Sequence, residues 1–194
     1  MLFRSKRTVL AALLLGASAA ARSDVVEVCF NYGCNKRAEV NYDSAAIETI
    51  RLQFEGVASA ADERYAIGWA VAWMYQIAGT QTPVWRDRGG NIDDDAQSEG
   101  RMDCIDHSTN ATAFLRSMER WGLLRFHRAG DPVQRGIFLS LHLAASVVAL
   151  GSGDVYAVDS WFYDPGNPAT IYTLDEWRRG KRPPGTELFR WSKY

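Results

Sequence analysis

Two apolar runs on either side of a short glycine-rich break constrain the fold of this chain most strongly. The runs are "GIFLSLHLAASVVAL" (136–150) and "VYAVDSWFYD" (155–164), and "GSGD" lies between them. Both runs are rich in the Val, Leu, Phe and Tyr residues that favour strands, and glycine favours tight turns. Two such runs joined in this way predict an antiparallel β-hairpin.

The expected turn sets the register of this hairpin. If Gly151 and Ser152 are the central residues of a type II′ turn, Ala144 lies opposite Asp159. His142 then shares a face of the sheet with Asp159 as a diagonal neighbour, roughly 7 Å away between Cβ atoms. A shift of one residue would put the two on opposite faces. Because a carboxylate in an apolar strand is costly unless it is paired, a His142–Asp159 interaction is predicted.

The rest of the chain is expected to be mainly helical before the hairpin. A helix is predicted from about Cys104 to a stop at Gly122, with an apolar stripe at helical spacing and Asp103 as a candidate N-cap. The other expected elements are a strand at 37–42, helices at 43–56 and 60–77, a polar loop at 79–103, a strand at 123–128 and a short helix that begins at the capping box 173–176. Helices followed by an antiparallel sheet predict an α+β fold, and 22–194 is expected to be a single domain.

The N-terminal residues have the pattern of a signal peptide. "MLFRSKR" is basic, "TVLAALLLGASAA" is apolar, and small residues at 17–19 and 19–21 fit a cleavage signal. We therefore expect residues 1–21 to be removed, a periplasmic or secreted protein, and no stable membrane span after cleavage; an uncleaved anchor is the alternative. The formal net charge is −1 without a basic stripe, so nucleic acid is not expected as a partner.

The chain has three cysteines, an odd number for an exported protein. Cys29 and Cys34 lie close together in "VCFNYGCN", and the four residues between them suit a turn. A Cys29–Cys34 disulfide is the simplest pairing, and a reduced pair is the alternative. Cys104 is then left over, as a reactive thiol, an intermolecular link or an inert buried thiol.

Cys104 has one feature that favours a nucleophile and two that oppose it. A thiolate is stabilised at a helix N-terminus by free N–H groups and by the helix dipole. Asp103 and Asp106 are negative and close, and they oppose ionisation. A base is therefore required to activate the thiol.

Three histidines could supply that base. His107 is one helical turn from Cys104, where side chains run side by side instead of converging. His127 lies between two arginines and is expected at an exposed strand position. His142 lies in the hairpin with Asp159, so Cys104, His142 and Asp159 form the predicted triad.

This arrangement resembles the papain-like and transglutaminase-like cysteine enzymes. "DCIDHSTNATAFLRSMERWGLL" is similar to their nucleophile helix, "HLAASVVAL" to their histidine strand and "YAVDSW" to the strand of their third residue. The resemblance covers roughly 100–165. It implies that Cys104 is the nucleophile, His142 the base and Asp159 its orienting partner, and that Trp161 shields the His–Asp bond from water.

One feature departs from the family pattern. The papain-type oxyanion glutamine lies shortly before the nucleophile, and Gln97 is the nearby candidate. The backbone N–H of Cys104 could supply one oxyanion donor.

The expected function is thiol-dependent acyl transfer, with a thioester intermediate and a peptide, protein or cell-wall amide as the substrate. No cofactor and no metal are expected. A catalytically inactive binding module with the same fold is one alternative. The other is a structural zinc site that uses Cys104 and His107 with Asp103 or Asp106.

Overall fold

The computed structural model describes residues 23–91, 98–136 and 141–186. The expected signal peptide and Gln97 lie outside the described residues. In chain order the elements are β1 (Asp24–Phe30), β2 (Lys36–Tyr42), α1 (Ser44–Arg51), η1 (Leu52–Phe54), α2 (Ala60–Gln81), η2 (Pro83–Arg86), η3 (Gly89–Asn91), α3 (Cys104–Arg120), β3 (His127–Ala129), β4 (Val133–Arg135), β5 (His142–Ala149), β6 (Val155–Asp159), β7 (Thr170–Thr173) and α4 (Leu174–Arg178).

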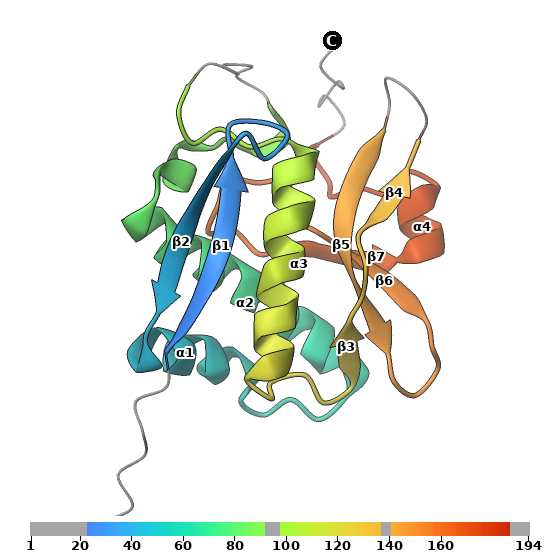
Figure 1. The fold of residues 1–194 in the computed structure, drawn as a ribbon. Coiled ribbons are helices and arrows are strands. Elements are labelled where there is room, and N and C mark those ends of the chain that lie inside the picture. Colours follow the sequence, from blue (N-terminus) through green and yellow to red (C-terminus); the bar gives the residue numbers. More distant parts are fainter. Residues whose placement is uncertain (1–22, 92–97, 137–140, 187–194) are drawn as a thin grey trace, which may run out of the picture.

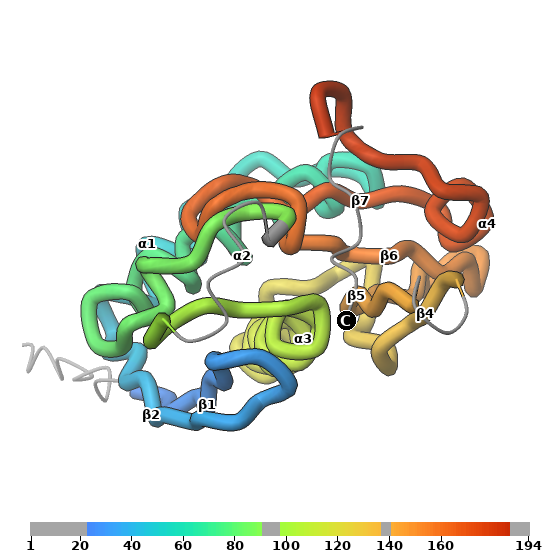
Figure 2. Tube along the Cα trace, turned by 90° about the horizontal axis from the view of Figure 1, so that it is seen from above, coloured from blue at the N-terminus to red at the C-terminus, as the bar shows by residue number. Residues whose placement is uncertain are grey.

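The strands form two antiparallel sheets on either side of α3 (Figure 1). β1 pairs with β2, and the larger sheet has the order β3-β5-β6-β7, with β4 also paired to β5. Viewed along its axis, α3 lies between the β1–β2 hairpin and α2, with β5 beside it (Figure 2). The chain therefore has a mixed α+β fold with antiparallel sheets, as the sequence predicts at this level.

The main hydrophobic core fills the space between these layers. Its fully buried members come from both sheets, α2 and α3, and include Val28, Val40, Ile67, Val71, Met74, Phe114, Leu115, Val147 and Val158. The apolar stripe of α3 is thus divided between two partners, because both β1 and β5 pack against this helix. Within the described part of the chain, no helix is long and apolar enough to cross a membrane.

Capping signals in the sequence correctly mark the ends of several helices. Asp103 is the N-cap of α3, and its carboxylate accepts hydrogen bonds from the amides of Ile105 and Asp106. Gly122 follows the end of α3 with a φ of +72°, the left-handed conformation that a glycine adopts readily. The predicted capping box at 173–176 is present at the start of α4.

The predicted hairpin register is confirmed, but the predicted turn is wrong. Ala145 pairs with Val158, which is the register expected from the sequence. The loop is wider than a type II′ turn, because the amide of Gly153 donates to the carbonyl of Ala149 at 2.8 Å. Gly153, with φ +77°, and not Gly151, adopts the left-handed conformation. Opening the loop by one residue on each side leaves the pairing unchanged, so the register does not depend on the turn type.

Three strands that the sequence patterns do not predict complete the sheets. β1 pairs along its whole length with β2, β4 lies beside β5, and β7 pairs with β6. The expected strand at 123–128 is displaced, since β3 begins at His127. α2 also continues to Gln81, into the stretch expected to be a loop. The short strands β4 and β7 form because the longer strands β5 and β6 supply the hydrogen-bonding edge.

Candidate active site

Cys104 occupies the first position of α3, where that helix meets β5. It is a free, half-buried cysteine. Its thiol is hydrogen-bonded by the backbone of Leu143, the residue that follows His142 in β5. Its neighbour in sequence, Ile105, is 42% exposed, and Leu141 at the start of the strand is 41% exposed. The thiol therefore lies at the edge of the protein interior, and exposed apolar residues are found nearby in both α3 and the segment that leads into β5.

The surroundings of Cys104 favour the protonated thiol. The pKa of the thiol is raised to about 11, chiefly by burial and also by the negative charges of Asp103 and Asp159. Hydrogen bonds from the backbone of Leu143 and of Cys104 itself act in the opposite direction. The expected stabilisation at a helix N-terminus is thus outweighed by desolvation, so a base must remove the proton if Cys104 is to act as a nucleophile.

The pair predicted from the hairpin, His142 and Asp159, is formed in the structure. Nε2 of His142 lies 2.7 Å from Oδ2 of Asp159, and the residues are 0% and 2% exposed. The backbone amide of Trp161 donates to Oδ1 of the same carboxylate at 3.2 Å. Because Nε2 is bound to the carboxylate, Nδ1 is the ring nitrogen left to serve as a base toward other groups.

Aromatic rings surround this His–Asp pair. The centroids of the Trp161 and Phe162 rings lie 5.0 Å and 5.9 Å from the centroid of the His142 ring. The Trp177 centroid lies at 5.6 Å, and its indole Nε1 donates to Oδ2 of Asp159 at 2.8 Å. Trp161 is buried beside the His142 ring, and its shielding of the His–Asp bond from water stays a prediction.

Trp177 is the site residue that the sequence reasoning missed. It is fully buried at the end of α4, far along the chain from Asp159. The one available signal was chemical: an indole N–H that is buried requires an acceptor, and Asp159 is a carboxylate in an apolar strand. Arg135 in turn contacts Trp177. Its guanidinium lies 4.6 Å from the centroid of the Trp177 ring and donates to the Trp177 carbonyl at 2.7 Å.

Asp159 is held in its charged form. Burial raises the pKa of this carboxyl, but the charge and hydrogen bond of His142, the hydrogen bond of Trp177 and the charge of Arg135 outweigh it. The net effect is a pKa below the ordinary value. An ionised carboxylate at this position favours the proton on the neighbouring imidazole nitrogen, which is the orienting role in a catalytic triad.

His107, the alternative base, is bound elsewhere. Its Nε2 lies 2.9 Å from Oδ2 of Asp87, and its Nδ1 lies 3.0 Å from Oγ of Ser160 and 3.3 Å from the Tyr75 hydroxyl. The amide of Met102 donates to the other oxygen of Asp87 at 2.8 Å. This buried network joins α2, α3, the segment before α3 and the end of β6. It therefore fixes the first turn of α3 relative to the strand that carries Asp159.

The expectation that His127 is exposed is wrong. It is 1% exposed, and its Nδ1 lies 3.0 Å from Oε1 of Glu63 in α2. The Glu63 carboxylate also accepts hydrogen bonds from the backbone amides of Arg125, Phe126 and His127. Its pKa is lowered, because these hydrogen bonds and His127 outweigh the effect of burial. The flanking arginines indicate a solvated position. His127 is buried instead, because Glu63 of α2 binds both its side chain and its backbone amide.

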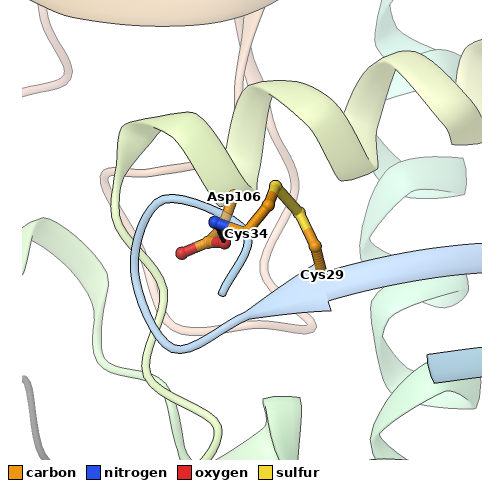
Figure 3. A group of neighbouring side chains, drawn as sticks. All are labelled: Cys29, Cys34 and Asp106. Carbon is orange, nitrogen blue, oxygen red and sulfur yellow. Dashed lines mark hydrogen bonds between the residues drawn. A yellow bond between two sulfur atoms is a disulfide. The ribbon is translucent and has the colours of Figure 1, made fainter. Parts of the chain in front are cut away.

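Asp103 and Asp106 anchor the N-terminal loop as well as capping α3. Gly33 N donates to Asp103 Oδ2 at 3.1 Å, and Cys34 N donates to Asp106 Oδ1 at 2.8 Å. The predicted Cys29–Cys34 disulfide is present and lies against the first turn of α3 (Figure 3). The two aspartates that flank Cys104 thus hold the disulfide loop onto the first turn of α3.

The ligand set of the zinc alternative is not brought together. Among the described residues, the one cluster of three potential ligands consists of Cys29, Cys34 and Asp106. The sulfurs of that cluster are joined in the disulfide and do not act as thiolate ligands.

Comparisons with protein-family models, curated proteins and solved structures return no match for this chain. The chemistry of the site therefore stands on its own geometry: a half-buried thiol at a helix N-terminus is hydrogen-bonded by the backbone of Leu143, and the preceding residue, His142, is bound to a buried carboxylate.

Proposed function

We propose that this protein is an exported cysteine acyl-transfer enzyme with a papain-like or transglutaminase-like core, in which Cys104 is the nucleophile, His142 the base and Asp159 the orienting acid. The observation that carries the proposal is the buried hydrogen bond between His142 Nε2 and Asp159 Oδ2, next to the strand residue whose backbone bonds the Cys104 thiol. The other two histidines are also paired with buried carboxylates, His107 with Asp87 and His127 with Glu63, but neither of these carboxylates lies in the β5–β6 hairpin.

The proposed reaction begins with a neutral thiol, since the pKa of Cys104 is raised. Nδ1 of His142 takes the thiol proton as the sulfur attacks an amide or ester carbonyl, and Asp159 stabilises the resulting imidazolium. The backbone N–H groups of Cys104 and Leu143, both directed at the sulfur, are candidates for donors to the carbonyl oxygen. The imidazolium then protonates the leaving amine, and water or a second amine resolves the thioester.

The substrate class follows from the surface next to the thiol. Ile105, the residue after Cys104, and Leu141, two residues before Leu143, are exposed apolar side chains. Such side chains fit the aliphatic part of a peptide or cell-wall amide better than a charged polymer. A disulfide is compatible with an oxidising compartment, so we propose a periplasmic or secreted location.

The proposal is tested by the alkylation of Cys104 with iodoacetamide as a function of pH. The tryptic peptide 102–116 reports Cys104 separately from the other two cysteines. In the wild type, His142 should allow alkylation with a midpoint well below the thiol pKa of about 11. In His142→Gln the midpoint should move up toward that value, and acylation of Cys104 by p-nitrophenyl acetate should be lost.

His127→Gln is the matched control, because it also removes a buried histidine that is paired with a carboxylate. It should leave the alkylation profile unchanged. A wild-type profile that is identical to that of folded His142→Gln would reject the enzyme proposal in favour of a non-catalytic module.

A further inference from the structure

The two halves of the Cys29–Cys34 disulfide are unequally exposed. Cys29 is 1% exposed, whereas Cys34 is partly exposed at the end of the loop. Thiol–disulfide exchange requires one sulfur that an external thiolate can reach and a second sulfur that leaves. Because Cys34 is the more exposed residue of the pair, its sulfur is the one expected to be attacked, and the leaving sulfur is then that of Cys29.

A buried carboxylate lies beside both sulfurs. Asp106 is 0% exposed, and one of its oxygens and the sulfurs of Cys29 and Cys34 all lie within 4.8 Å of one another (Figure 3). The carboxylate is held there by the amide of Cys34 at 2.8 Å and by the amide of Asp103 at 3.0 Å. The bond from the Asp103 amide belongs to the capping box of α3, whereas the bond from the Cys34 amide and the closeness to the two sulfurs go beyond helix capping.

The protonation state of Asp106 suits proton transfer near neutral pH. The pKa of this carboxyl is raised to about 7, chiefly by burial and also by the negative charge of Asp103. The amides of Asp103 and Cys34 act in the opposite direction. Asp106 also acts on Tyr75 in α2, because its charge raises the pKa of that phenol.

We propose that Cys29, Cys34 and Asp106 form a thiol–disulfide exchange site that uses a small monothiol of the glutathione class as its co-substrate. The external thiolate attacks the sulfur of Cys34, a mixed disulfide forms, and the Cys29–Cys34 bond breaks. The Cys29 sulfur leaves with the bonding electron pair and takes the proton of Asp106. A second thiolate then attacks the mixed disulfide and releases the oxidised co-substrate, and the Cys34 thiolate takes a proton from solvent. The net reaction converts one protein disulfide and two thiols into two protein thiols and one small-molecule disulfide.

The buried position of Cys29 is what requires Asp106 in this reaction. A thiolate that leaves into an apolar interior is strongly disfavoured unless it is protonated as it forms. Cys29 is excluded from solvent, so the adjacent carboxyl is the group that can supply the proton. The inference does not involve Cys104 and is independent of the proposed acyl-transfer function.

The test measures the reduction of the folded, full-length protein by glutathione from pH 5.5 to 8.5. Samples are quenched with acid and N-ethylmaleimide, and mass spectrometry follows the tryptic peptide 23–36, which contains both cysteines of the disulfide. Rates are divided by the concentration of glutathione thiolate. The wild type should pass through an adduct on Cys34. At pH 6 it should react about tenfold faster than Asp106→Asn, and the two rates should converge above pH 8 as Asp106 ionises.

Asp103→Asn is the matched control. Asparagine remains a good N-cap through the oxygen that accepts from Ile105 and Asp106, so the helix start is kept, while one negative charge and the bond from the Gly33 amide are removed. This variant should keep the fast reaction but shift its pH profile to lower pH, because Asp103 raises the pKa of Asp106. Equal rates for the wild type and Asp106→Asn at every pH overturn the proposal. Equal reductions of the rate in Asp103→Asn and Asp106→Asn overturn it too. A rate that is independent of the glutathione concentration also overturns it, because it indicates reduction through global unfolding.

Discussion

Replacing Asp159 by asparagine tests the His–Asp pair. The test is whether alkylation of Cys104 becomes slower or faster. The carboxylate accepts three hydrogen bonds, from His142 and Trp177 at Oδ2 and from the amide of Trp161 at Oδ1. An asparagine side chain has only one acceptor oxygen. If that oxygen takes the Oδ2 position, the bonds from His142 and Trp177 are kept and only the longer 3.2 Å bond from Trp161 is lost. This orientation is favoured, so the tautomer of His142 is retained and only the negative charge is removed.

The magnitude follows from the difference between charged and neutral acceptors. A hydrogen bond to a charged group contributes about 1.5–3 kcal/mol and a neutral one about 1 kcal/mol, so stabilisation of the imidazolium falls by about 1–2 kcal/mol. At 1.36 kcal/mol per factor of ten, alkylation of Cys104 at pH 7 should become roughly tenfold slower in Asp159→Asn. Loss of the bond from the Trp161 amide in Asp159→Asn should also lower the free energy of unfolding by about 1–3 kcal/mol.

A thiol that acts without His142 gives the opposite result. The charge of Asp159 raises the pKa of Cys104 by repulsion, so its removal alone would make the thiol more reactive. Asp103→Asn is the control for this effect, because Asp103 also raises the pKa of Cys104 but has no bond to a histidine. The assay is the rate of iodoacetamide alkylation of peptide 102–116, with thermal unfolding measured in parallel. Slower alkylation in Asp159→Asn and faster alkylation in Asp103→Asn are expected. Faster alkylation in both would refute the role of Asp159.

Three further predictions concern stability. The pKa of Asp106 is raised from 3.8 to about 7. The stabilisation that this carboxyl gives the folded protein is therefore fully present below pH 3.8 and is lost as the pH rises toward about 7. Urea unfolding should therefore show the wild type losing up to ~1.4 kcal/mol per pH unit relative to Asp106→Asn between pH 5 and 7, and a constant difference would contradict this. Gly100→Ala should destabilise by about 2–4 kcal/mol against about 1 kcal/mol for Gly122→Ala in the same assay. Both glycines have positive φ, but only the Cβ at Gly100 would lie 2.0 Å from the Pro83 carbonyl oxygen; equal losses would reject this steric argument. Asn110→Ala should cost about 2–3 kcal/mol in the unfolding free energy, because it leaves a buried N–H and C=O of β1 unpaired; a loss below ~0.5 kcal/mol would show that water replaces the side chain.

The amino-acid sequence by itself determines the features that depend on near neighbours. The pairing of β5 with β6 follows from the alternation of side chains and a short glycine-rich loop, so it brings His142 and Asp159 to one face even though the turn is of another type. Asp103 is recognisable as an N-cap because the amides that donate to its carboxylate lie within three residues. The Cys29–Cys34 bridge is predictable for the same reason, since the loop that joins them is short.

Only the tertiary structure decides which distant groups satisfy the buried polar residues. Trp177 reaches Asp159, Asp87 binds His107, and Glu63 draws His127 into the interior, and none of these partners lies near its target in the chain. The physical reason is that a buried donor or charge requires a partner, but the chain topology determines which one is within reach. The same holds for Cys104: its helix position follows from the sequence, whereas its raised pKa follows from packing against β5.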